Sequence, residues 1–282
     1  MNYKQALTHT VFETISKSAQ ELNLDCYVIG GFVRDLILKR GSHKDIDVVA
    51  IGSGIKLAKQ VAKNLPTQPK VQIFKTYGTA MLQFDGIEVE FVGARKESYS
   101  EDSRNPIVEN GTLEDDQNRR DFTINALALD LNSNNFGELL DPFNGIQDLE
   151  HKIIRTPLNP DITYSDDPLR MLRAIRFASQ LDFVIEKESL DALSRNSSRI
   201  EIITKERIVT ELNKILESQK PSIGFLLLEK TGLLKRILPE LTHLKGIDEI
   251  EGLKHKDNFY HTLEVVDNIS KYTDNVWLRW AA

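Results

Sequence analysis

The sequence predicts an α/β head of about 150 residues, followed by a second half that is entirely helical. Short runs with the apolar or alternating pattern of β-strands are confined to the first part of the chain, at residues 26–29, 45–51, 70–75, 79–84 and 87–92. Helical periodicity lies between the early strands at 32–39 and 54–64, and strand patterns nearly vanish beyond residue 152. A single sheet with helices packed against it accounts for this mixture.

Further elements are predicted from periodicity and composition. An amphipathic helix over residues 3–23 is expected before the first strand. The polar stretch 97–118, which contains Pro106 and Gly111, predicts a long mobile loop, and loops of that length are usually functional or disordered. In the second half we predict helices at 167–181, 187–195, 204–217, 221–231 and 258–271.

Bulk properties restrict the class of protein. With a net charge of −6, the chain is not one that binds nucleic acid through overall basicity, so any RNA contact requires local clusters of arginine. One cysteine, Cys26, excludes an internal disulfide, suits a reducing cytoplasm and is expected to be a small buried side chain. No signal peptide or membrane span is recognisable. Residues 275–282 predict an apolar helix that stops without a capping residue or a polar tail, which suggests that the natural protein continues.

A glycine pair interrupts the first strand and opens a helix. Gly30 and Gly31 let a phosphate approach the backbone, and the helix after them presents unpaired N–H groups. Arg34, one turn into that helix, adds a cationic fork suited to phosphate. A lone glycine pair is usually only a turn, so its interpretation depends on the residues of the next strand.

Two aspartates occupy that next strand. Because side chains alternate along a strand, Asp45 and Asp47 point to the same side. Two such carboxylates repel each other unless a cation lies between them, and hard oxygen ligands favour Mg²⁺. A phosphate cradle beside a metal-binding acid pair is suited to nucleotidyl transfer.

Three other polar clusters have both a functional and a structural interpretation. Glu90 shares a strand face with Glu88, where it either joins the aspartates or is simply solvated. Arg119 and Arg120 can bridge triphosphate oxygens or form a surface charge cluster. The helix after Asp167 and Pro168 is capped at its start. Its apolar side chains share a core face, and a second face carries Asp167, Arg170 and Arg173.

In strand–glycine–helix–strand order these features resemble the nucleotidyltransferase superfamily. The form Gly30-Gly31-x-Val33-Arg34-Asp35 with Asp45-x-Asp47 is similar to the tRNA nucleotidyltransferase and poly(A) polymerase family. Residues 119–126 read RRDFTINA, which is that family's motif letter for letter. The resemblance covers nearly the whole chain and is closest to the class II bacterial CCA-adding enzymes. It implies a nucleotidyltransferase head at 1–150, a base-recognising neck at 151–217, and a body at 218–282 that begins a truncated C-terminal, HD-like region.

The resemblance also implies residue roles and partners. Asp45 and Asp47 would hold Mg²⁺, and Glu90, five residues before Arg95, would help to deprotonate the attacking 3′-hydroxyl of tRNA. Arg120 is the implied triphosphate contact. In the neck, Asp167 and Arg170 match the residues that serve the family as an amino-acid template for the base of CTP or ATP. Arg173 and Arg176 would support the bound nucleotide.

The chemistry of the pair Asp167 and Arg170 fits this role. A carboxylate accepts from the exocyclic amine of cytosine and adenine, whereas uracil and guanine present a carbonyl there. The helix at 205–212 resembles the family's ERIxxEL segment and is expected to brace the neck helix. His255 and His261 lack the partners of a zinc site and the family's His-Asp pair, so no phosphohydrolase activity is expected.

Alternatives stay open at this point. A bacterial poly(A) polymerase shares every head motif, and enzymes that add only CC or only A belong to the same family. A non-catalytic RNA-binding module that kept the fold is a rival of another class, and the intact pair Asp45 and Asp47 argues against it.

Overall fold

The computed structural model describes residues 1–41, 44–100, 103–246, 249–250, 253–254 and 257–282. It divides into two compact units. The first contains residues 1–98 and 106–151, and the second contains 152–282 together with 99–105. The division of the second unit at residue 217 stays a prediction, and His255 lies outside the described residues. Among the described helices, none is both long and apolar enough to cross a membrane.

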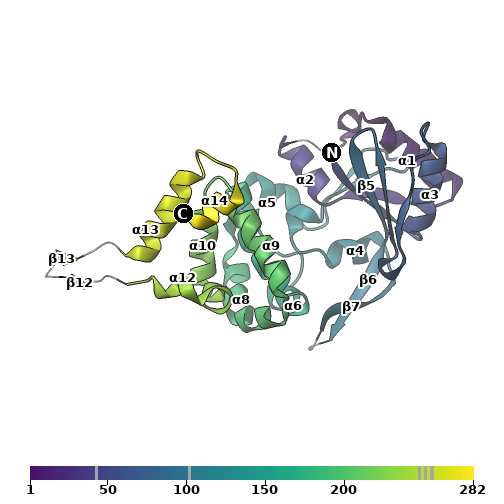
Figure 1. Ribbon diagram of the computed structural model, residues 1–282. Coiled ribbons are helices and arrows are strands. Elements are labelled where there is room, and N and C mark those ends of the chain that lie inside the picture. Colours follow the sequence, from purple (N-terminus) through teal and green to yellow (C-terminus); the bar gives the residue numbers. More distant parts are fainter. Residues whose placement is uncertain (42–43, 101–102, 247–248, 251–252, 255–256) are drawn as a thin grey trace. The chain divides into compact units, whose positions relative to one another are not determined.

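A seven-stranded sheet forms the centre of the first unit (Figure 1). Its spatial order is β3 (Gln72–Phe74), β4 (Thr79–Phe84), β5 (Ile87–Gly93), β2 (Asp45–Ala50), β1 (Cys26–Ile29), β8 (Ala128–Asp130) and β9 (Leu139–Leu140). Only β2 and β5 run parallel to each other, and the other described pairs are antiparallel. The five predicted strands are therefore confirmed within a few residues, whereas β8 and β9 were not predicted from the sequence.

Helices cover one face of this sheet. α1 (Thr10–Glu21) begins where the His9 imidazole accepts a hydrogen bond from the Val11 N–H, and α3 (Gly54–Asn64) begins at the Ser53 cap. The two helices pack against each other, and α3 also contacts β2, β4 and β5. Between them and the sheet lie fully buried apolar side chains such as Val48, Phe91 and Leu57. Cys26 is also buried, as predicted, and burial raises the pKa of its thiol to about 12.

The prediction of a long loop at 97–118 is wrong, because this segment contains regular secondary structure. Strands β6 (Arg95–Ser100) and β7 (Ser103–Asn110) form a two-stranded ribbon, and the short helix α4 (Leu113–Asn118) comes after it. A two-stranded ribbon needs no apolar face and tolerates Pro106 because neither strand is central in a sheet. Helix α4 starts at a reciprocal capping box in which Thr112 and Asp115 satisfy each other's backbone N–H groups.

The second unit is mainly helical (Figure 1), which confirms the predicted class. The helices that match predictions are α7 (Leu169–Leu181), α8 (Lys187–Asn196), α9 (Lys205–Leu216), α10 (Pro221–Lys230) and α13 (Asn258–Ile269). Helix α14 (Val276–Ala281) matches the apolar helix predicted at 275–282. Three helices were not predicted: α6 (Pro160–Asp166), α11 (Leu233–Ile237) and α12 (Pro239–His243). Two short ribbons also occur, β10 (Ile153–Ile154) with β11 (Val184–Ile185) and β12 (Glu249–Ile250) with β13 (Leu253–Lys254).

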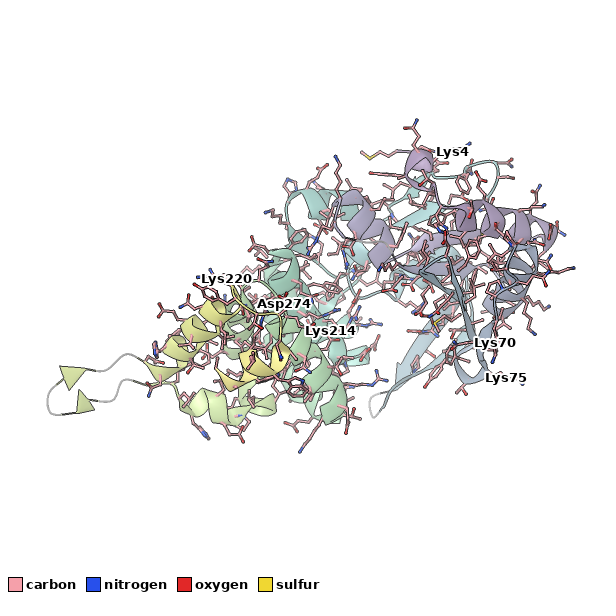
Figure 2. All side chains as sticks on the ribbon, turned by 45° about the horizontal axis from the view of Figure 1, so that its top comes forward. Lys4, Lys70, Lys75, Lys214, Lys220 and Asp274 are labelled. Carbon is pink, nitrogen blue, oxygen red and sulfur yellow. The ribbon has the colours of Figure 1, made fainter. Side chains whose placement is uncertain are left out.

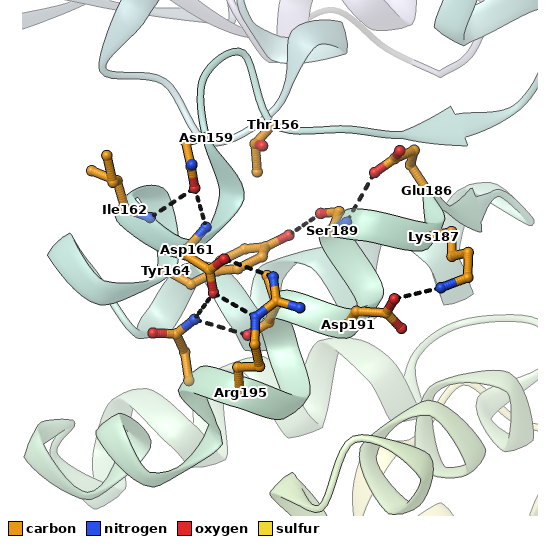
Figure 3. A network of polar contacts seen from close by, with 12 residues as sticks. Thr156, Asn159, Asp161, Ile162, Tyr164, Glu186, Lys187, Ser189, Asp191 and Arg195 are labelled. Carbon is orange, nitrogen blue, oxygen red and sulfur yellow. Dashed lines mark hydrogen bonds and ion pairs between the residues drawn. The ribbon is translucent and has the colours of Figure 1, made fainter.

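Polar contacts fix α6 against α8 (Figure 3). The guanidinium of Arg195 donates to both carboxylate oxygens of Asp161, at 3.0 and 2.6 Å. Nearby, the buried Tyr164 hydroxyl lies 2.5 Å from the Ser189 hydroxyl. The Asn159 side chain caps the first turn of α6. Helix α6 leads directly into α7, and the second group of candidate site residues lies between the two helices and along α7.

Candidate functional site

Four acidic side chains line the face of the head sheet that α1 and α3 leave uncovered. On β2, exposed Asp45 and Asp47 alternate with buried Ile46 and Val48, which point toward the helices. The parallel register of β2 and β5 places Asp45 opposite Glu88 and Asp47 opposite Glu90. We call Asp45, Asp47, Glu88 and Glu90 the carboxylate row.

Ionisation is less favourable for two members of the carboxylate row, Asp47 and Glu90, than for an isolated carboxylate. Although Asp47 is exposed on the sheet face, the protein groups around its carboxylate partly desolvate it and raise its pKa above the ordinary value; the negative charges of Asp45 and Asp116 add to this effect, and Arg120 opposes it. The pKa of Glu90 is also raised, first by partial burial and then by Asp47 and Glu88. Both carboxylates therefore favour a proton or a cation more than an isolated carboxylate does.

The raised pKa of Glu90 predicts how the stability of the protein depends on pH. Because the folded-state pKa of Glu90 exceeds its ordinary value of 4.5, the folded protein holds that proton to higher pH than the unfolded chain does. The contribution of Glu90 to stability is therefore greatest below that ordinary value and is lost as the pH rises through the folded-state pKa. In metal-free thermal melts, Glu90→Gln should raise the melting temperature relative to wild type at pH 7, and this gain should shrink toward pH 4.

Glu21 provides a control of opposite sign. Hydrogen bonds from Asn64 and Gln60 lower its pKa, so its contribution is present above its ordinary value of 4.5 and lost as the pH falls through the folded-state pKa. Glu21→Gln should accordingly lower the melting temperature at pH 7. If the rise in melting temperature caused by Glu90→Gln stays constant from pH 4 to pH 8, the raised pKa of Glu90 would be contradicted.

A glycine turn closes one side of the carboxylate row. Gly30 ends β1 with φ 85° and ψ −137°, a conformation that is open almost only to glycine. A Cβ placed on Gly30 would lie 2.9 Å from Nη1 of Arg120 and 3.4 Å from Oδ2 of Asp47. Because Gly30 has no side chain, its backbone, the Arg120 guanidinium and the Asp47 carboxylate can lie close together. Gly31 begins helix α2 (Gly31–Ile37) next to it.

A buried carboxylate that the sequence analysis missed holds both arginines of the RRDFTINA motif. Asp116, on α4, accepts from Arg119 through Oδ1 at 2.5 Å and from Arg120 through Oδ2 at 3.0 Å. Its side chain is fully buried. The spacing i, i+3 and i, i+4 links Asp116 to these two arginines only if the segment is a helix, which its polar composition does not predict. Asp116 therefore fixes the position of Arg120 beside Gly30.

Arg34 is placed differently from a free phosphate ligand. Its guanidinium binds both carboxylate oxygens of Asp35, at 2.9 and 2.8 Å, and donates to the Asn125 amide oxygen at 2.8 Å. The Asn125 amide in turn donates to Asp121 at 3.0 Å. These two bonds fix the Asn125 side chain within the turn that follows Arg120. The geometry gives Arg34 an internal hydrogen-bonding role, and its expected contact with phosphate stays a prediction.

The donor set of the carboxylate row fits a hard divalent cation. Asp45 and Asp47 offer carboxylate oxygens from one face of one strand, and their mutual repulsion contributes to the raised pKa of Asp47. Within the described ranges, no group of three or more acidic, histidine or cysteine side chains is already arranged to hold an ion. Asp45 and Asp47 supply part of the oxygen coordination of such a cation, and its other ligands would come from outside the protein.

The second group of candidate residues lies on α6 and α7 in the second unit. Asp167 accepts a hydrogen bond from the Leu169 N–H at 3.2 Å, so it caps α7 as predicted. Arg170 is largely buried. The guanidinium of Arg173 lies 5.5 Å from the centre of the Phe177 ring. The expected core face is confirmed, because four side chains with helical spacing are fully buried: Met171, Ala174, Ile175 and Ala178.

Arg176 belongs to the packing between helices. Its Nε lies 2.8 Å from Oε2 of Glu211 on α9, and its guanidinium lies 4.2 Å from the centre of the Phe177 ring. Helix α9 is the ERIxxEL segment, and its contacts with α7 confirm that it braces this helix. Arg176 is thus placed as part of the brace, and its expected contact with a nucleotide stays a prediction.

Two families match the chain. Residues 26–155 match the poly A polymerase head domain, and residues 182–245 match the family described as the probable RNA and SrmB-binding site of polymerase A. The A-adding tRNA nucleotidyltransferase of Geobacter sulfurreducens is 36% identical over 252 residues, which are 86% of this chain and 28% of that protein. The CCA-adding enzyme of Anoxybacillus flavithermus is 36% identical over 86% of this chain and 57% of its own length. The chain thus spans about a quarter to a little over half of these relatives.

Solved structures of the same kind share the fold. A tRNA nucleotidyltransferase in complex with a primer tRNA and an incoming ATP analog superposes with a TM-score of 0.74 at 29% identity, over 94% of this chain and 73% of that one. A CCA-adding enzyme in an apo form superposes with a TM-score of 0.73 at 31% identity, over 95% of this chain and 65% of that one.

Proposed function

Because the chain belongs to the tRNA nucleotidyltransferase and poly(A) polymerase family, we propose that it adds C and A nucleotides to the 3′ end of tRNA from CTP and ATP. The observation that carries this proposal is the convergence of Asp47, Gly30 and Arg120 on one region of the uncovered sheet face. A carboxylate pair beside a glycine turn and a fixed arginine provides separate places for a divalent ion and for a triphosphate.

The residues of the head have complementary roles in the proposed transfer. Asp45 and Asp47 would hold Mg²⁺, which supplies charge neutralisation at the phosphates and lowers the pKa of a bound hydroxyl. The Gly30 turn admits the triphosphate, and Arg120 binds its oxygens. Glu90 accepts the proton of the RNA 3′-hydroxyl, a role that its raised pKa suits. The new bond forms between the 3′-oxygen and the α-phosphorus as the bond to pyrophosphate breaks.

Selection of the base falls to the second unit in this proposal. The carboxylate of Asp167 would accept from the exocyclic amine shared by cytosine and adenine, while Arg170 donates to a neighbouring ring acceptor. Arg173, beside Phe177, would support the bound nucleotide. Uracil and guanine would place a carbonyl against the carboxylate and leave both acceptors unpaired.

Replacing Asp167 by alanine should relax the choice of base more than it slows transfer. We expect the preference for CTP and ATP over UTP and GTP to fall by about 10- to 100-fold, because a matched hydrogen-bonding pair discriminates by roughly 1–3 kcal/mol. Rates of single-nucleotide incorporation with each of the four triphosphates measure this.

Two further variants separate base recognition from helix capping. Asp167→Asn keeps an acceptor for the Leu169 N–H but adds a donor at the base edge, so its specificity should also relax. Asp182→Asn changes an aspartate at the other end of α7 and should leave specificity unchanged. An Asp167→Ala protein that still prefers C and A as strongly as wild type would refute the assignment.

Three RNAs test the reaction itself. We would incubate the protein and Mg²⁺ with tRNA ending before CCA, tRNA ending in CC, and an unrelated RNA, each with one nucleotide at a time, and measure product length. The proposal predicts C addition to the first, A addition to the second and little extension of the third. A homopolymeric A tail on the third would indicate a poly(A) polymerase, and no incorporation at all would indicate a non-catalytic RNA-binding module.

Addition of A alone is the second candidate. It is favoured by the A-adding tRNA nucleotidyltransferases of Geobacter sulfurreducens and Aquifex aeolicus, each 36% identical over the aligned region. In the assay above, this candidate predicts extension only of the tRNA that already ends in CC.

A further inference from the structure

A pocket of about 420 Å³ opens on the uncovered face of the head sheet, beside the carboxylate row. Its apolar lining includes Phe74 and Tyr77, whose side chains are unusually exposed for aromatic residues, at 44% and 70%, together with Met81. Its polar lining includes Glu90 and Thr79. We call it the aromatic pocket. The roles proposed above account for Glu90 but not for the exposed rings.

The register of the sheet places this pocket next to the reacting groups. Phe74 on β3 pairs with Thr79 on β4, and Met81 on β4 pairs with Glu90 on β5. Glu90 in turn pairs with Asp47 on β2. Paired residues project from the same face of a sheet, so the pocket and the aspartates share one surface. Thr79 and Glu90 both line the pocket, so the Glu90 carboxylate lies at its wall.

The aromatic pocket and the glycine turn lie on opposite sides of Asp47. The strand order β3-β4-β5-β2-β1 puts the pocket on the β5 side of Asp47 and Gly30 on the β1 side. In phosphoryl transfer the attacking and leaving oxygens lie roughly in line across the phosphorus. With the leaving pyrophosphate held on the Gly30 side, the attacking hydroxyl must approach from the side of Glu90 and the pocket.

We propose that the aromatic pocket binds the 3′-terminal nucleotide of the RNA, whose base stacks on Tyr77 and Phe74 while its 3′-hydroxyl faces Glu90. This inference rests on the proposed function, because it needs an RNA hydroxyl as the nucleophile. Every base has a π-face, so stacking holds a terminal base with little regard to its identity. That property suits a site that must accept a different terminal base after each addition.

Charge near the pocket agrees with an RNA strand as the occupant. Lys75 directly follows Phe74, Lys70 precedes β3, and both are exposed at the outer edge of the head (Figure 2). Ammonium groups at this edge can bind the phosphates that lead to the terminal nucleotide. The carboxylate row itself repels phosphate, which leaves the terminal sugar and base as the part of the strand that fits beside it.

Fluorescence of an RNA that ends in 2-aminopurine tests the proposal, because stacking quenches this base. Wild type and Tyr77→Phe should quench it on binding. Tyr77→Ala and Phe74→Ala should bind it about ten-fold more weakly and leave it brighter, since loss of one stacking ring lowers affinity by roughly 5- to 100-fold. The same variants should raise the KM for RNA about ten-fold and leave the KM for the nucleotide unchanged.

The controls are a matched tyrosine and a moved probe. Tyr272→Ala removes an exposed tyrosine from the second unit and should change neither quantity. A 2-aminopurine placed six nucleotides before the RNA end should be insensitive to Tyr77. Unaltered quenching and RNA affinity in both Tyr77→Ala and Phe74→Ala would overturn the pocket assignment even if wild type incorporates nucleotides. Absence of incorporation by wild type would instead overturn the proposed function.

Discussion

Replacing Asp47 by asparagine should lower nucleotide incorporation by about 10³-fold or more and, in metal-free buffer at pH 7, raise the melting temperature. The rate falls because a charged oxygen ligand is lost where phosphate charge must be neutralised. Stability rises because burial and the charges of Asp45 and Asp116 oppose ionisation of Asp47 in the folded protein, as its raised pKa indicates. Steady-state incorporation and thermal melts of the same preparations measure the two effects.

Asp85 offers a matched control for this substitution. It lies in the turn between β4 and β5, its side chain is 79% exposed, and its φ of 49° is one that asparagine also adopts readily. Asp85→Asn should therefore leave both rate and melting temperature near wild type. Mg²⁺ should raise the melting temperature of wild type and of Asp85→Asn but much less that of Asp47→Asn. An Asp47→Asn protein that retains a tenth of the wild-type rate would refute the metal-site assignment.

Replacing Gly30 by alanine should damage both stability and catalysis. The backbone conformation of Gly30 costs a residue with a Cβ about 1–3 kcal/mol, so the free energy of unfolding should fall by that amount. The new methyl group would also lie 2.9 Å from Arg120, whose guanidinium must then move away from the position that Asp116 gives it. We expect the KM for the nucleotide to rise and kcat to fall, with a combined loss of about 10²-fold or more.

Gly86→Ala is a control that separates the effect of an unfavourable backbone conformation from the effect of displacing Arg120. Gly86 also has a positive φ, 76°, but no atom lies within 4 Å of its added Cβ. This variant should lose stability to a similar extent and keep its kinetic constants. If Gly30→Ala is destabilised but fully active at a temperature where it is folded, Gly30 shapes only the backbone and does not border the triphosphate.

The elements that could be predicted from the sequence are those in which the spacing of apolar residues matches the face that is buried in the folded protein. The alternation of acidic and apolar residues from Asp45 to Val48 predicted both the strand and the shared side of the aspartates, because one face of β2 is buried under the helices. The spacing of apolar residues in α7 predicted its core face for the same reason.

The parts that were missed depend on partners distant in the chain or on exposed backbone pairing. The ribbon β6–β7 is a two-stranded sheet of its own, and its polar composition looks like that of a loop. The short strands β8 and β9 are held by pairing with β1 and with each other, which no local pattern reveals. Helix α6 has a capping asparagine and a proline in its first turn, but it spans only seven residues.

Sequence motifs indicate most of the candidate residues, but neither Asp116 nor the interactions between these side chains could be predicted from them. Sequence motifs identified Arg34 and Arg120 together as phosphate-binding candidates, and only the three-dimensional contacts distinguish them. Asn125 and Asp35 occupy the guanidinium of Arg34, whereas Asp116 holds Arg120 against Gly30. The role of Asp116 depends on its complete burial between two arginines, which is a property of the folded chain.

A crystal of the protein grown with Mn²⁺ and a non-hydrolysable CTP analogue tests the central claim most directly. Anomalous scattering locates Mn²⁺ independently of any assumption about the site. We predict a peak bound by the carboxylates of Asp45 and Asp47, with the triphosphate of the analogue on the side of Gly30 and Arg120. A fully bound analogue whose Mn²⁺ peak and phosphates lie away from these two aspartates would contradict the account.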